Sequence, residues 1–240
     1  MTETAAPAPL LDLALPGEWS MIALESGEAS AASVRALVRE RFGRRDDQAV
    51  FRAEQRLALE RAAADARRGN ATQFVVSGRT DHKVAFGATV IEYQPTLVLG
   101  PGPVDAASVV DAFARRAMAV EAGRELKDDE HWGLLEDSGA AVFEKGDALV
   151  VRRDRYASHA PTVPGRTGTP TEHDEPLMSY SVDYWITVPG ERRLVLLSCS
   201  SILAELAPLM LELFDGIVDA STWRRAAPAA SLRAQLSGGS

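Results

Sequence analysis

Residues 180–222 read YSVDYWITVPGERRLVLLSCSSILAELAPLMLELFDGIVDAST. From Tyr180 to Val188 apolar residues alternate with polar ones, which is the period of a strand that buries one face. Pro189-Gly190 is typical of a tight turn, because proline fixes φ and glycine accepts a positive φ. Residues 193–200 return as a Leu/Val-rich strand, and apolar residues then recur at helical spacing over 203–222. The stretch predicts an antiparallel hairpin covered by a helix whose regular part begins, or kinks, near Pro208.

The rest of the chain shows the same mixture of strands and helices. Ser30 can cap a helix that ends at Gly43, and Asp46 or Asp47 can open a second helix that runs to Gly69. These two helices form a predicted helical hairpin over residues 30–69. A further helix begins after Asp105. The other expected strands are Leu10–Leu15, Trp19–Leu24, Gln73–Ser77, Lys83–Tyr93, Thr96–Leu99, Trp132–Glu136, Ala141–Glu144 and Ala148–Arg155, the last two joined by Lys145-Gly146-Asp147.

This order of elements predicts an α+β fold, with an antiparallel sheet flanked by helices as an α/β/α sandwich. Residues 1–9 and 226–240 are rich in Ala, Pro, Ser and Gly and are expected to be disordered tails. Residues 10–225 are then a single domain. Within it, residues 157–176 contain four prolines and no periodicity, which predicts a long loop.

Composition excludes several classes of function. The formal charge of −8 argues against a general affinity for nucleic acid or for an anionic membrane surface. No apolar run of 18 residues exists and the N-terminus lacks a secretory signal, so we expect a cytoplasmic protein without membrane insertion. Cys199 is the only cysteine, which rules out an internal disulfide, and its place in a strand predicts an inert thiol.

Two short motifs carry a family resemblance. Leu15-Pro16-Gly17-Glu18-Trp19 resembles the opening of the PsbP-like α/β/α sandwich proteins, and the segment FDGIVDAS at 214–221 looks like their final element. The resemblance implies a non-catalytic domain that binds protein partners or supports larger assemblies. It also implies that the helical hairpin at 30–69 is an insertion relative to the compact members. Only three of the 26 basic residues are lysines, and the chain is also similar to proteins of GC-rich actinobacteria.

The sequence contains few candidates for a metal-binding or catalytic site. The densest set of potential metal ligands is His173, Asp174 and Glu175, in the long Pro-rich loop. A loop without enforced geometry favours solvated charges, so we expect neither a metal nor another cofactor. The run Ser198-Cys199-Ser200-Ser201 with His131 or His173 as base suggests acyl transfer, but the G-x-S-x-G elbow is absent. Serines in this position are more typical of a helix cap.

Charge is distributed unevenly along the chain. Residues 31–69 contain 10 arginines and 6 acidic residues, a balance of +4, and the remainder has 16 basic and 28 acidic residues, a balance of −12. The predicted partner-binding residues are Arg52, Arg56, Arg67, Arg68 and Trp185. Alternatively, the basic hairpin docks on the acidic body of the same chain, and Trp185 is a core residue if helices cover both sheet faces.

The sequence favours a non-enzymatic cytoplasmic domain that binds another protein as an adaptor, and the basic hairpin favours an acidic partner. One alternative is a hydrolase or a small-molecule-binding protein with a pocket between sheet and helix, since catalytic groups can assemble from distant positions. A second alternative, which the actinobacterial resemblance supports, is an accessory protein of a secretion or injection apparatus.

Overall fold

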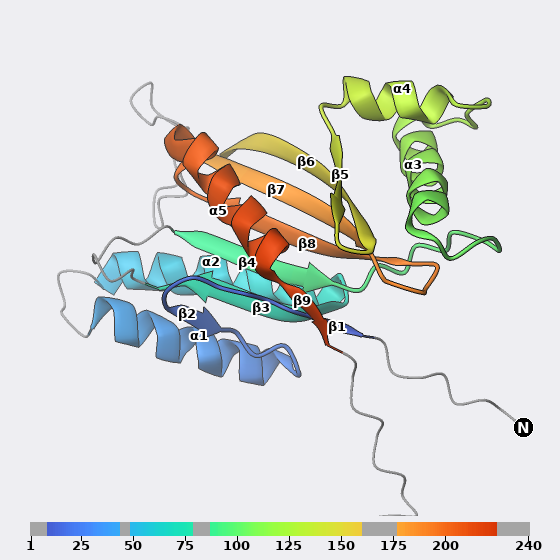
Figure 1. Ribbon diagram of the computed structural model, residues 1–240. Coiled ribbons are helices and arrows are strands. Elements are labelled where there is room, and N and C mark those ends of the chain that lie inside the picture. Colours follow the sequence, from blue (N-terminus) through green and yellow to red (C-terminus); the bar gives the residue numbers. More distant parts are fainter. Residues whose placement is uncertain (1–8, 44–48, 79–86, 160–176, 225–240) are drawn as a thin grey trace, which may run out of the picture.

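The computed structural model describes residues 9–43, 49–78, 87–159 and 177–224. Its main sheet is antiparallel and contains β2 (Trp19–Met21), β3 (Ala71–Ser77), β4 (Ala88–Tyr93), β5 (Ala141–Lys145), β6 (Ala148–His159), β7 (Leu177–Thr187) and β8 (Leu194–Ser201). The strands lie in the order β2-β3-β4-β8-β7-β6-β5 (Figure 1). A separate two-stranded sheet pairs β1 (Leu10–Asp12) with β9 (Thr222–Arg224). The predicted α+β class is therefore confirmed.

The predicted hairpin forms at the middle of the sheet. β8 pairs with β7 along its whole length, and the backbone N–H of Val188 donates to Arg193 O at 3.1 Å across the Pro189-Gly190 turn. Gly190 has a φ of +74°, which an L side chain rarely adopts. The alternation is also as expected, because Tyr184 and Ile186 are fully buried on one face of the sheet.

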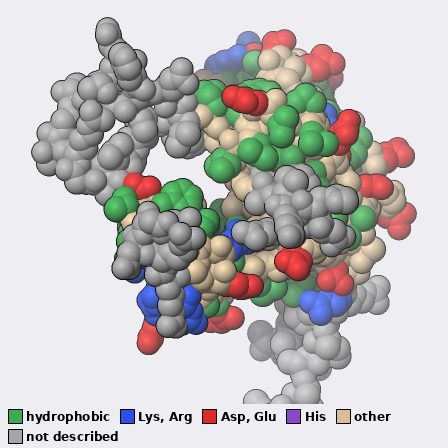
Figure 2. All heavy atoms as spheres, turned by 90° about the vertical axis from the view of Figure 1, so that its left-hand side faces the viewer, with side chains coloured by type: hydrophobic (Ala, Val, Ile, Leu, Met, Phe, Trp, Pro, Cys, Tyr) green, Lys and Arg blue, Asp and Glu red, His purple; other side chains and the backbone are tan. Residues whose placement is uncertain are grey.

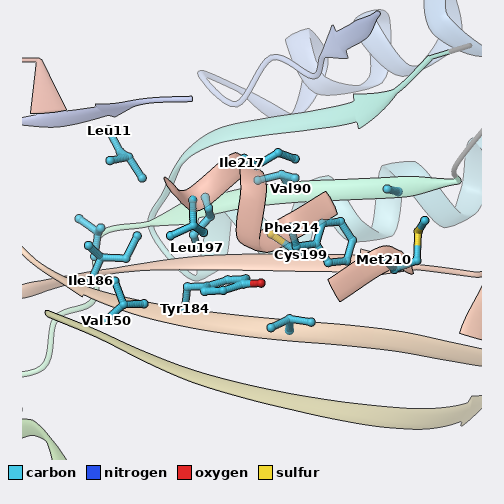
Figure 3. Close-up of a cluster of buried hydrophobic side chains, with 14 of the residues drawn as sticks. Leu11, Val90, Val150, Tyr184, Ile186, Leu197, Cys199, Met210, Phe214 and Ile217 are labelled. Carbon is cyan, nitrogen blue, oxygen red and sulfur yellow. The ribbon is translucent and has the colours of Figure 1, made fainter. Parts of the chain in front are cut away.

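The helix that follows covers this face. It is α5 (Ala207–Ala220), preceded by the short 3₁₀ turn η2 (Ala204–Leu206). Pro208 lies in the first turn of α5, where no hydrogen bond within the helix is lost, so the expected start near Pro208 is confirmed. Figure 3 shows Met210, Phe214 and Ile217 of α5 in the cluster of side chains from the central strands.

Two pairs of helices cover the opposite face, which makes the fold a three-layer α/β/α sandwich. α1 (Gly27–Phe42) and α2 (Ala49–Arg68) pack with Phe74 and Val76 of β3. α3 (Ala106–Ala122) and α4 (Glu130–Asp137) pack with Val151 of β6 and Leu194 of β8. The buried neighbours Val75, Val150 and Val195 belong instead to the cluster under α5, as strand alternation requires. That α1 and α2 are an insertion stays a prediction.

Three sequence predictions are corrected here. Ser26, not Ser30, caps α1: the Ser26 hydroxyl accepts from Ala29 N, and Ser30 is buried inside the helix with its hydroxyl bonded to Ala23 O. Trp132–Glu136 belongs to helix α4, in which His131 and Leu135 are buried four residues apart on one face. Five residues are too few to separate a helical period from a strand period.

The third correction concerns Thr96–Leu99, which is not a strand. The sheet position beside β4 is already occupied by β8. Leu97 and Leu99 instead pack their apolar side chains against the cluster under α3. The other predicted strands and the helix capped by Asp105 form, with shifted ends; Gly43 ends α1 as expected. Strand β6 continues to His159, so residues 157–159 of the predicted loop belong to the sheet instead.

Some predictions fall on residues outside the described part of the chain. These are the two tails apart from Pro9, the start of the predicted strand at Lys83, residues 160–176 of the long loop, and the cap of the second helix at Asp46 or Asp47. The division into one domain and two tails stays a prediction.

A buried carboxyl group links the sheet to the β1 segment. Glu92 of β4 is fully buried, and it accepts hydrogen bonds from Gln73 Nε2 at 2.7 Å and Gln94 Nε2 at 3.1 Å. Gln73 Nε2 also donates to Leu11 O at 2.8 Å. Burial raises the pKa of Glu92, and the hydrogen bonds that it accepts oppose this rise only in part.

This gives a pH-dependent stability that can be measured. Because the folded pKa of Glu92 lies above its unfolded value of about 4.3, the folded state holds the proton more tightly. The contribution of Glu92 to stability is therefore full below about pH 4 and is lost as the pH rises through the folded pKa. Urea unfolding of wild type and Glu92→Gln over a pH series should show the variant gaining stability relative to wild type as the pH rises. A stability difference that is independent of pH would contradict this assignment.

Candidate functional site

A pocket between α1 and α2 is lined by four arginines. Arg35 and Arg39 lie one helical turn apart on α1, and Arg52 and Arg56 lie one turn apart on α2. The helices pack against each other around Val38, whose side chain is buried. Small residues complete the lining, namely Gly43, Ala49 and Ala53, so the arginines surround a hollow of about 310 Å³.

Two of these arginines, Arg35 and Arg39, lack an acidic partner among the described residues. Arg56 has a long ionic contact of 3.9 Å with Glu60, on the next turn of α2. Within the described residues, neither Arg35 nor Arg39 makes an ion pair or a side-chain hydrogen bond. Like charges one turn apart cost about 0.2–0.5 kcal/mol per pair in a helix. Packing the two pairs against each other adds to this cost, so the site favours an anion.

The third arginine of α1, Arg41, holds the helix pair on the sheet. The guanidinium of Arg41 donates to Val76 O of β3 at 3.1 Å. Half-burial lowers the pKa of Arg41, an effect that the nearby Glu40 carboxylate opposes. Arg41 therefore has a structural role, whereas Arg35 and Arg39 are exposed.

The four arginines predicted from the sequence do not form one surface. Arg52 and Arg56 lie in the pocket, but Arg67 and Arg68 lie at the far end of α2, about 22 Å from Arg52 along the helix. They line a separate hollow of about 400 Å³ with Leu24, Ala64, Asn70 and Ala71, and Arg68 pairs with Asp65. The sequence analysis missed Arg35 and Arg39, although their spacing of four residues indicates a shared helix face.

Trp185 lies among the core residues and not on an open face. Its ring packs against Phe113 of α3 with the ring centroids 4.7 Å apart, and it joins the cluster under α3 and α4. Helices cover both faces of the sheet, so the alternative in which Trp185 packs in the core describes its environment. A tryptophan packed in this way offers little surface to a partner.

The hydroxyl groups of β8 are engaged within the sheet. Ser198 Oγ donates to Asp183 Oδ1 at 2.7 Å, and Asp183 also pairs with Arg155. Ser200 Oγ and Thr89 Oγ1 lie 2.7 Å apart and share a hydrogen bond. This arrangement makes a polar row across the centre of the sheet.

The histidine suggested as a catalytic base is also occupied elsewhere. His131 of α4 is fully buried, with Nε2 at 2.8 Å from Asp111 Oδ1 and Nδ1 at 3.2 Å from Asp128 O. Cys199 is fully buried, and burial raises the pKa of its thiol. The described residues therefore do not bring a serine or cysteine nucleophile next to this base.

The candidate metal ligands His173, Asp174 and Glu175 lie outside the described residues. In the part of the chain that the structure covers, no group of three His, Cys, Asp or Glu side chains could hold a metal ion. None of the described helices is long and apolar enough to cross a membrane.

Comparison with known proteins does not add to these observations. The chain matches no family model, no curated protein and no solved structure. The resemblance to PsbP-like proteins therefore rests on the two sequence motifs alone.

Proposed function

We propose that this chain is a cytoplasmic protein-binding adaptor domain, and that the pocket of Arg35, Arg39, Arg52 and Arg56 receives an acidic segment of its partner. The convergence of four arginines from two helices is the observation that carries the proposal. Guanidinium groups bind carboxylates in a bidentate way, and they are more weakly hydrated than ammonium groups. The net charge of −8 disfavours an extended polyanion such as nucleic acid, most of whose length would face acidic surface, whereas a short acidic segment meets only the basic pocket.

An apolar surface at the same end of the molecule supports the proposal. Figure 2 looks onto this end and shows arginine or lysine side chains gathered on the α1–α2 pair, and hydrophobic side chains on the side of α5. Leu206, the last residue of η2, and Leu209, in the first turn of α5, are 46% and 49% exposed. Interfaces combine an apolar centre with charged residues that steer association. Exposed ion pairs give only about 0–1 kcal/mol each, so the arginines would supply steering and orientation.

Charge reversal tests this proposal. The double variant Arg35→Glu/Arg39→Glu should lose the captured partner in an affinity pull-down from the native organism, followed by mass spectrometry. Its matched control is Arg67→Glu/Arg68→Glu, which reverses the same charge at the far end of α2 and should keep the partner. Both double variants should keep the melting temperature of wild type, because all four side chains are solvent-facing.

The outcomes separate binding from intramolecular docking. Equal loss of partner in both double variants would show that net charge, and not the pocket, matters. A lowered melting temperature of Arg35→Glu/Arg39→Glu, with unchanged recovery of the partner per folded molecule, would favour docking of the hairpin on the acidic body of the same chain. It would contradict the partner hypothesis. Partners with basic surfaces would contradict the proposed chemistry.

Small-molecule binding is the second candidate, because α3 borders a larger hollow of mixed character. This pocket of about 530 Å³ is lined by apolar residues such as Leu99 and Leu126 together with Asp111, Arg115 and Arg192. Few polar groups among apolar ones are typical of ligand sites. However, Arg192 is already bonded to Gly100 O at 2.8 Å and Pro103 O at 2.6 Å, so it holds the Gly-Pro loop in place. This engagement makes the α1–α2 pocket the stronger candidate.

A further inference from the structure

Strand β6 extends well beyond the strand that pairs with its outer side. β5 covers only Ala148–Arg152, whereas β6 continues to His159 and remains paired with β7 on its inner side. In Figure 1, β6 forms the margin of the sheet past the end of β5. Among the described residues, none pairs with the outer side of β6 beyond Arg152.

The register shows which backbone groups face outward at this margin. The two-residue turn Gly146-Asp147 makes Lys145 and Ala148 a hydrogen-bonded pair, so even-numbered residues of β6 direct N–H and C=O toward β5. The inner contacts agree, since Leu149 N donates to Thr187 Oγ1 and Ala157 O accepts from Ser179 Oγ, both on β7. Beyond β5, the outward groups therefore belong to Asp154, Tyr156 and Ser158.

Charged side chains usually protect such an edge, but here each charge is engaged within the chain. Arg153 pairs with Glu121 of α3, and Arg155 pairs with Asp183 of β7. Asp154 accepts a hydrogen bond from the Tyr180 hydroxyl at 3.2 Å. The two arginine charges are thus paired, and the Asp154 carboxylate is held by a hydrogen bond inside the sheet, so these side chains protect the edge less than free charges would.

We propose that a second copy of this chain adds to the sheet here, with the two β6 segments antiparallel about a two-fold axis at Tyr156. In this register Tyr156 lies opposite Tyr156 of the second copy, and Asp154 lies opposite Ser158. Each of these pairs exchanges two backbone hydrogen bonds. Aromatic side chains directly opposite each other stabilise a strand pair, and no like charges are directly opposed.

The register shifted by one hydrogen-bonded pair toward β5 is worse. Centring the axis on Asp154 would place two carboxylates opposite each other and push the second copy onto β5, which ends opposite Arg152. The self-complementary spacing about Tyr156 favours a second copy over an unrelated strand, because a two-fold dimer uses the same patch twice. The pairing also covers apolar surface on the edge strand, since Tyr156 is 58% exposed.

The test is the oligomeric state of the full chain by sedimentation velocity over a concentration series. Wild type should be a dimer that dissociates on dilution. Ser158→Pro removes one outward N–H from each copy, and proline is tolerated on an edge strand when its nitrogen faces solvent. This variant should dimerise on the order of tenfold more weakly or worse, because two hydrogen bonds are lost per dimer.

Ser158→Ala is the matched control, because it keeps the backbone N–H and should dimerise as wild type does. Should Ser158→Pro fail to fold by circular dichroism, Tyr156→Asp replaces it, since it places two carboxylates opposite each other at an exposed position. A monomeric wild type at every concentration would overturn the proposal. So would a dimer that these variants leave intact, or one that Ser158→Ala also abolishes.

Discussion

Phe214→Ala should destabilise the protein by about 3–5 kcal/mol, the cost typical of truncating a fully buried phenylalanine. Phe214 lies on the inner face of α5 with no exposed surface, in the cluster of side chains from the central strands (Figure 3). Its removal leaves a cavity between helix and sheet that the paired strands cannot collapse to fill. For a chain of this length, each kcal/mol lowers the melting temperature by about 2–4 °C, so we expect a fall of about 6–20 °C.

Leu209→Ala is the matched control on the same helix. Leu209 is 49% exposed, so its truncation should cost about 1 kcal/mol or less. The melting temperatures of both variants are measured by circular dichroism, and their free energies of unfolding by urea titration. Equal destabilisation by the two changes would contradict the way in which α5 packs on the sheet.

Asp215→Ala should destabilise the protein by about 1–3 kcal/mol, because it leaves a buried hydroxyl without an acceptor. Asp215 of α5 accepts from the Tyr184 hydroxyl at 2.8 Å and from Arg152 Nη1 at 2.6 Å. Tyr184 is fully buried, and its burial raises the pKa of the phenol, so the hydroxyl stays protonated and needs this acceptor. The carboxylate thus links α5 to both β7 and β6.

A double-mutant cycle distinguishes this bond from a general loss of packing. Tyr184→Phe removes the hydroxyl, so Asp215→Ala should cost less in the Tyr184→Phe background than in wild type, by about 0.5 kcal/mol or more. The free energies come from urea unfolding of the four proteins. Additive effects of the two substitutions would show that the hydroxyl does not depend on Asp215.

The local sequence pattern was sufficient to predict the centre of this fold. The β7–β8 hairpin follows from strict alternation and from a turn whose glycine has a positive φ, both of which are properties of adjacent residues. The start of α5 at Pro208 follows from the missing N–H of proline, and the ends of α1 at Gly43 and α3 at its Asp105 cap are equally local. Each of these features needs only a few consecutive residues.

For short apolar segments the local pattern was not sufficient to predict secondary structure, because their neighbours in space decide it. Trp132–Glu136 is helical since His131 and Leu135 both find burial against α3, and Thr96–Leu99 stays unpaired since β8 already lies beside β4. A five-residue window does not contain that information.

The candidate site shows the same division. The sequence by itself determined that residues 31–69 are basic and predicted a pair of helices there, and so that arginines would be available for an acidic partner. Only the packing of α1 against α2 decided that Arg35 and Arg39 join Arg52 and Arg56, while Arg67 and Arg68 lie elsewhere. Likewise, only the placement of α3 on the sheet decided that Trp185 packs against Phe113 and is partly buried. Charge and periodicity are properties of residues that are close in sequence. The convergence of side chains depends on how helices cross and on which sheet face they cover.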